Sequence, residues 1–131
     1  LVSEIPEIAQ AEMLAHAKAC LPNEACGYLV GDSATERVQR FVPPTNSPGS
    51  PTRFVFKPHE QLAAKQAIDA GGEQVIGIAH LHPNGGPTPS AVGIADARRF
   101  DPFGMLLHVV IAPTTGEICS HRIINGEIAA I

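Results

Sequence analysis

The amino-acid sequence predicts an α/β fold, a mixed β-sheet with helices packed on it. Apolar runs of strand length alternate along the chain with segments whose apolar residues recur at helical spacing. Many of the 12 glycines and 12 prolines cluster at 43–51 and 83–89, which marks two loops rather than general disorder. With 131 residues and no internal repeat, we expect a single domain over 1–131 with one hydrophobic core.

The first half of the chain predicts one helix followed by strands. Pro6 suits the first turn of a helix, and Ile8, Met13 and Ala17 follow at roughly helical spacing, so we expect a helix from about Pro6 to Cys20. The elements expected next are a strand at 25–31, a turn at 32–35, a strand at 37–42, a loop at 43–51 and a short strand at 53–56.

The second half begins with a predicted helix from His59 to about Ala70, which Gly71 and Gly72 end. The elements expected after it are a strand at 74–82, a helix at 90–100, a strand at 106–112, a turn at 113–116 and strands at 117–124 and 127–131. The strand at 106–112 is the most hydrophobic. Together with the helix at 6–20, it is a surface that could support a homodimer.

Composition excludes several classes of protein. The net charge is −4 and no run of Lys or Arg occurs, which argues against a nucleic-acid partner. No apolar stretch reaches the roughly 20 residues that span a bilayer, so we expect no membrane contact. The first residues, 1–4, lack the features of a signal peptide. The three cysteines have no metal-type spacing, and reduced thiols in the cytoplasm are the expectation.

The segment His80-Leu81-His82-Pro83 carries most of the functional information. Side chains alternate between the faces of a strand, so His80 and His82 point the same way and can reach one metal ion. A lone histidine is more often structural than a ligand, but a pair at a strand end before a glycine-rich loop favours a metal site. A catalytic zinc ion keeps three protein ligands, so a third His, Asp or Glu should lie nearby.

Glu24 and Ser90 are two further candidates, each with an ordinary structural explanation. On position alone Glu24 is an exposed carboxylate before a strand, and Ser90 is a helix N-cap, a role that serine favours whatever the function. Beside a metal-bound water, Glu24 would act as a general base. Ser90 would then donate a hydrogen bond to a developing oxyanion.

Gly93 is the third residue of the helix that Ser90 opens. A carboxylate or an amide would suit this position, whereas glycine inside a helix costs about 1 kcal/mol relative to alanine. The physics of the helix therefore gives no reason for Gly93.

Taken together, these residues resemble the JAMM motif of the MPN+ (Mov34/MPN/PAD-1) metalloproteases, which has an upstream Glu, then His-x-His-Pro, a Ser and, three residues later, an Asp. The positions of this motif are occupied by Glu24-Ala-Cys-Gly-Tyr-Leu-Val-Gly31, His80-Leu-His-Pro83 and Ser90. The segments 46–48 and 54–58 are similar to the part that joins the two motif halves in small prokaryotic members. The resemblance extends from about residue 5 to 124.

The resemblance implies a cytidine-deaminase-like fold and a zinc hydrolase. In this reading His80 and His82 bind Zn²⁺, Glu24 is the general base and Ser90 stabilises the oxyanion. Members of the family cut amide or isopeptide bonds after the C-terminal Gly-Gly of ubiquitin-like proteins, and the small prokaryotic ones look suited to sulfur-carrier proteins. We expect the extended tail of such a partner to bind between the loops at 43–51 and 84–89.

Gly93 departs from the motif, because the third metal ligand of the family, an Asp, would fall there. Asp96 lies one helical turn further, about 4.5 Å along the helix axis. Ligand distances vary by only about 0.2 Å, so Asp96 would ligate only if the helix shifted or a water bridged the gap. The other possibility is a variant with weak or absent metal and reduced or absent peptidase activity.

Three other classes of protein compete with a JAMM hydrolase. The H-x-E and P-C-x-x-C signature of zinc deaminases is missing from the sequence. Cys26 is a poor nucleophile candidate because it lies within an apolar strand. A metal-free MPN-type scaffold that binds ubiquitin-like partners is the serious alternative, and Gly93 makes it credible. The remaining four histidines carry no motif and are expected on the surface or in the core: His16, His59, His108 and His121.

Overall fold

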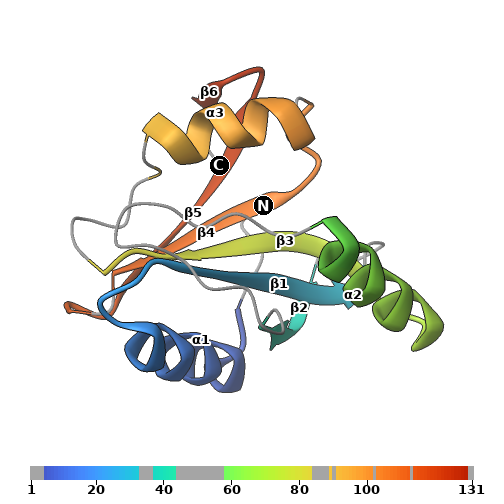
Figure 1. Cartoon of the computed structure of the whole chain (residues 1–131), viewed down its shortest axis with the longest axis horizontal. Helices are drawn as coiled ribbons and strands as arrows, with labels where there is room; N and C mark the ends of the chain where they lie inside the picture. The colour runs from blue at the N-terminus through green and yellow to red at the C-terminus, as the bar shows by residue number, and fades with distance from the viewer. Residues whose placement is uncertain are drawn as a thin grey trace.

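The computed structural model describes residues 5–32, 37–43, 58–83, 89, 91–101, 103–112 and 114–129. Within these residues the elements are α1 (Glu7–Cys20), β1 (Ala25–Asp32), β2 (Arg37–Val42), α2 (Pro58–Ala70), β3 (Gln74–Leu81), α3 (Ala91–Phe100), β4 (Leu107–Ala112), β5 (Glu117–Ile124) and β6 (Glu127–Ala129). The strands form one sheet in the order β2-β1-β3-β4-β5-β6, with α1 on one side of it and α3 on the other (Figure 1). The predicted mixed α/β fold is confirmed.

The described helices and strands lie within a few residues of their predicted bounds. Several predictions fall on residues outside the described ranges, namely most of the turn at 32–35 and of the loop at 43–51, the strand at 53–56, most of the loop at 83–89, and Ser90. No helix in the described part of the chain is both long and apolar enough to cross a membrane.

The sheet is mixed because β3 and β4 run parallel, while every other pair of neighbouring strands is antiparallel. The α3 helix provides the crossover that a parallel pair requires. Along β3, His80 lies opposite Cys26 of β1 and Val110 of β4. The His82 N–H continues this ladder, donating to the Ile111 carbonyl at 3.0 Å. The motif histidines therefore stand at the end of a central strand, where the backbone is held on both sides.

Apolar side chains cover both faces of the sheet. On one face, α1 buries Met13 and its neighbours against residues of β1, β3 and β4 such as Leu29. On the other face, Tyr28 and Ile78 pack with Ile68 of α2. All six residues of β4 are buried in the middle of the sheet, so this strand offers no exposed surface to a second copy, and the predicted homodimer stays a prediction.

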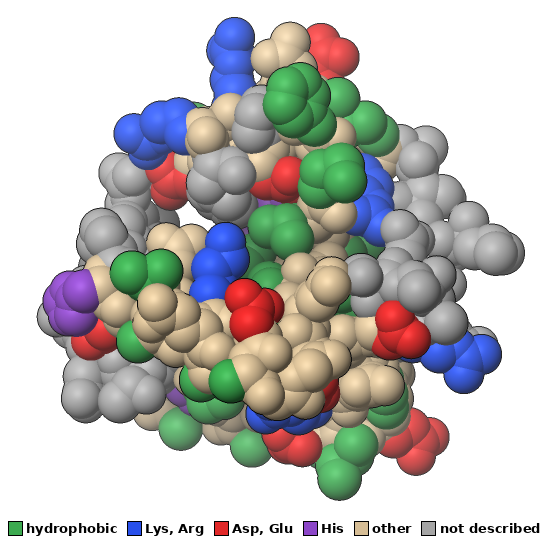
Figure 2. All heavy atoms as spheres, turned by 90° about the vertical axis from the view of Figure 1, so that its right-hand side faces the viewer, with side chains coloured by type: hydrophobic (Ala, Val, Ile, Leu, Met, Phe, Trp, Pro, Cys, Tyr) green, Lys and Arg blue, Asp and Glu red, His purple; other side chains and the backbone are tan. Residues whose placement is uncertain are grey.

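Apolar side chains are not confined to the interior. Phe103 and Met105, after α3, are 80% and 75% exposed. Figure 2 shows the face of the molecule at the right-hand side of Figure 1, where apolar side chains lie among side chains of both charges. The mixture of charges on this face agrees with the absence of any basic run in the sequence.

Candidate active site

A pocket lies between β3, β4, β5 and the first turn of α3. It is lined by His80, His82, Pro89, Gly93, His108 and Ile123. Segments far apart in the sequence thus bring both motif histidines and position 93 to the same place. Ser90 lies outside the described residues, so its predicted role stays a prediction.

Glu24 lies immediately before β1 and is 9% exposed, which contradicts the simple expectation of a solvent-exposed carboxylate. Its Oε1 atom is 3.8 Å from Nε2 of His82. Burial raises the pKa of Glu24, and the nearby negative charge of Asp96 raises it further. A carboxyl group shifted in this direction holds a proton closer to neutral pH, as a general base or acid must.

His80 is held in its neutral form. Burial, together with the neighbouring His108 and His82 rings, lowers the pKa of His80 to about 3. Its Nδ1 atom is 3.5 Å from the Cys26 thiol sulfur. A neutral imidazole is the form that binds metal ions, so His80 has the protonation state that a ligand needs at neutral pH.

The α3 side of the pocket lacks a ligating side chain at the position where the motif expects one. Gly93 faces the histidines there. Asp96, one turn further along α3, forms an ion pair with Arg99. Although the charge of Asp96 affects the pKa of Glu24, no three His, Cys, Asp or Glu side chains among the described residues are grouped to hold a metal ion. The described donors therefore do not complete the three-ligand set of a catalytic zinc site.

Two residues of this region have roles that differ from those of the motif members. Cys26 is 2% exposed, and burial raises the pKa of its thiol well above the usual value, as expected of an inert structural cysteine. His108 carried no motif in the sequence, yet it lines the pocket. In the sequence, His108 could have been noticed because it is the one polar residue in the otherwise apolar strand Leu107–Ala112.

Comparison with known proteins identifies the family. Residues 6–123 match the family described as prokaryotic homologs of the JAB domain. The CysO-cysteine peptidase of Mycobacterium tuberculosis is 33% identical over 116 residues, covering 88% of this chain and 79% of that protein. The probable TtuB-protein conjugate cleaving protease of Thermus thermophilus is 33% identical over 99 residues, covering 75% of this chain and 65% of that protein.

Solved structures share the fold. A protein from Desulfitobacterium hafniense is 34% identical and superposes with a TM-score of 0.79, covering 94% of this chain and 85% of that one. A JAB1/MPN domain protein from Archaeoglobus fulgidus, at 18% identity and a TM-score of 0.56, covers 93% of this chain and 88% of that one and shows the likeness in fold alone. The chain belongs to the small prokaryotic branch of the JAB/MPN (JAMM) family.

Proposed function

We propose that this chain is a JAMM-type peptidase domain that acts on conjugates of ubiquitin-like or sulfur-carrier proteins, cleaving the amide bond after a C-terminal Gly-Gly, and that Gly93 makes it a weak one. Relatives are named for a CysO-cysteine peptidase and for cleaving TtuB-protein conjugates, which supports the class of substrate. The free cysteines Cys20, Cys26 and Cys119 support placing this reaction in the reducing cytoplasm.

The observation that carries the proposal is the burial of Glu24 beside His82, at the pocket that His80 and His82 line. Burying a carboxylate next to a histidine costs folding free energy unless the two groups are paired. Apolar side chains could cover this part of the sheet without that cost, so folding alone does not explain why Glu24 is buried here. In the proposed reaction Glu24 accepts a proton from the attacking water and passes it to the amine of the leaving group. Ser90, which precedes Ala91 in the sequence, is proposed to donate to the oxyanion.

Among the described residues, the site lacks one of the three side chains that hold the zinc ion of this family. When bound, Zn²⁺ would polarise the scissile carbonyl and activate water. His80 and His82 are the proposed ligands, but Gly93 removes the third, and Asp96 would have to leave Arg99 to replace it. We therefore expect low metal occupancy and slow hydrolysis, both of which a carboxylate at position 93 should improve.

Gly93 also favours a second candidate function, a metal-free scaffold that binds the ubiquitin-like partner without cleaving it. The two candidates make different demands on Glu24. A scaffold has no need of a proton acceptor, whereas the peptidase loses its reaction without one.

The test uses sulfur-carrier proteins that end in Gly-Gly and are extended by one amide-linked cysteine. Loss of the added residue is followed by mass spectrometry for the unaltered chain, for Gly93→Asp, and for each of these carrying Glu24→Gln. We expect slow cleavage by the unaltered chain, faster cleavage by Gly93→Asp and none with Glu24→Gln. Binding of the carrier by all four proteins without cleavage by any of them would refute the peptidase and favour the scaffold.

A further inference from the structure

A buried histidine–aspartate pair lies beside the pocket, which its histidine lines, and neither residue belongs to the family motif. His108 on β4 is fully buried, and Asp101, which follows α3, is only 5% exposed. His108 Nε2 is 3.2 Å from Oδ2 of Asp101. Burying such a pair costs more free energy than burying two apolar side chains of similar size, so its position calls for an explanation.

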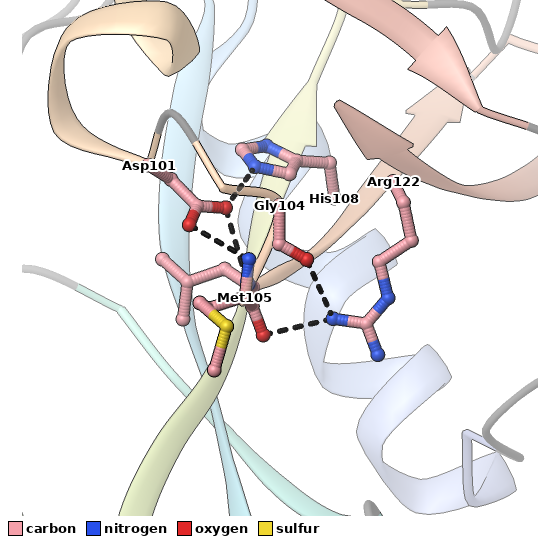
Figure 3. A network of polar contacts seen from close by, with 6 residues as sticks. Asp101, Gly104, Met105, His108 and Arg122 are labelled. Atoms are coloured by element: carbon pink, nitrogen blue, oxygen red, sulfur yellow. Dashed lines mark hydrogen bonds and ion pairs between the residues drawn. The ribbon is translucent and has the colours of Figure 1, made fainter. Parts of the chain in front are cut away.

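Asp101 is fixed by the backbone around it. Its Oδ1 accepts the Met105 N–H at 2.9 Å, and its Oδ2 accepts the Leu106 N–H at 3.0 Å (Figure 3). On the outer side of the same loop, Arg122 donates to the Met105 carbonyl at 2.8 Å. Because the carboxylate acts as an acceptor in these bonds, His108 carries its proton on Nε2 and donates it to Asp101.

His108 in turn lies against His80. In the parallel pair β3–β4, Ile78 is opposite His108 and His80 is opposite Val110, which places both histidines on one face of the sheet. Their ring centroids are 5.7 Å apart and their planes differ by 14°. From β1, the Cys26 sulfur approaches Nδ1 of His80 at 3.5 Å. His80 is therefore confined from two neighbouring strands.

We propose that Asp101 and His108 are positioning residues which, with Cys26, hold the His80 ring so that Nδ1 faces the protein and Nε2 faces the pocket. The inference rests on the proposed function, since it explains how His80 is presented to a metal ion or a substrate. Orientation of a histidine ligand by hydrogen-bonded neighbours typically changes metal affinity by about 10- to 100-fold.

The test is Asp101→Asn, which keeps the size of the side chain but replaces one acceptor oxygen with a donor. The matched control is Asp69→Asn, at an exposed position on α2. Nitrogen-15 NMR of the histidine rings reports which nitrogen of His80 carries the proton. Zn²⁺ affinity is measured in the Gly93→Asp chain, where a third ligand is present.

We expect Asp101→Asn to give His80 mixed ring signals and to weaken Zn²⁺ binding about 10- to 100-fold, and Asp69→Asn to change neither. Unchanged His80 signals and affinity, with only the unfolding free energy lowered, would overturn the inference. If Asp101→Asn does not fold, Cys26→Ala tests the same ring from β1, and unchanged His80 signals there would also overturn it. Neither readout uses a conjugate, so failure of cleavage alone would refute only the proposed function.

Discussion

The lowered pKa of His80 predicts a specific loss of stability in mild acid. The pKa of His80 is lowered from 6.5 to about 3, first by burial and then by the neighbouring His108 and His82 rings. Between these two values the unfolded chain binds a proton at this residue and the folded chain does not. The free energy of unfolding therefore falls as the pH decreases from 6.5 toward 3, and is regained as the pH rises.

The size of this effect follows from the shift. A difference of one pKa unit corresponds to 1.36 kcal/mol, so the change from 6.5 to about 3 amounts to about 5 kcal/mol once the pH is well below 3. At pH 5, where only part of the interval has been crossed, the same linkage gives about 2 kcal/mol. This loss is a large fraction of the 5–15 kcal/mol typical of a folded domain.

The assay is urea unfolding of chelator-treated protein at pH 7 and pH 5, followed by circular dichroism. His80→Gln removes the titrating ring, while His59→Gln changes an exposed histidine on α2. Between the two pH values, the unaltered chain and His59→Gln should each lose about 2 kcal/mol more than His80→Gln. The reasoning is refuted if His80→Gln loses as much stability as the unaltered chain.

Three further predictions concern the sheet, the core and the site. A Cβ atom at Gly31 would clash with the backbone carbonyl of Arg37, so Gly31→Ala should lower the unfolding free energy in urea by about 1–3 kcal/mol. A Cβ atom at Gly71 would have no neighbour closer than 3.5 Å, so Gly71→Ala should be nearly neutral. Met13 is fully buried under the sheet, so Met13→Ala should cost about 2–5 kcal/mol in the same assay; a cost below 1 kcal/mol would show that the core closes the gap. The raised pKa of Glu24 means that the folded chain holds this proton more tightly than the unfolded chain, so the free energy of unfolding falls as the pH rises above 4.5. Glu24→Gln should therefore gain stability relative to the unaltered chain from pH 4 to pH 7. A difference in unfolding free energy between the two proteins that does not change with pH would contradict this.

The helices and strands could be predicted because each is indicated by the pattern of apolar residues within its own segment of sequence. The run at 25–31 is apolar throughout, and the segment at 106–112 is apolar at every position except His108, as expected of buried central strands. Both strands lie inside the sheet. The first helix buries Ala9, Met13 and Ala17 against the sheet, whereas Ile8, which also belongs to the predicted apolar pattern, is exposed. What the pattern could not predict is strand order, because hydrophobic alternation does not say which strand lies beside which.

The site was predictable only where a motif marks it. His80 is in β3 and His82 directly follows it, so the alternation of side chains brings both to one pocket. The burial of Glu24 could not be predicted, because it depends on how β1 meets the end of β3. Likewise, His108 and Asp101 are seven residues apart, and a single polar residue in an apolar strand resembles an ordinary core residue until the fold places it beside His80.

The central claim is that this chain keeps the framework of a JAMM site and lacks one ligand. It is tested most directly by the amount of zinc per chain, determined by elemental analysis of protein purified without chelator. The unaltered chain, Gly93→Asp, and Gly93→Asp combined with His80→Ala are compared, and Asp96→Asn in the unaltered chain checks the substitute ligand. We expect well below one zinc per unaltered chain, close to one with Gly93→Asp, and none when His80 is also removed. One zinc per unaltered chain, lost with Asp96→Asn, would contradict the account and make Asp96 the third ligand.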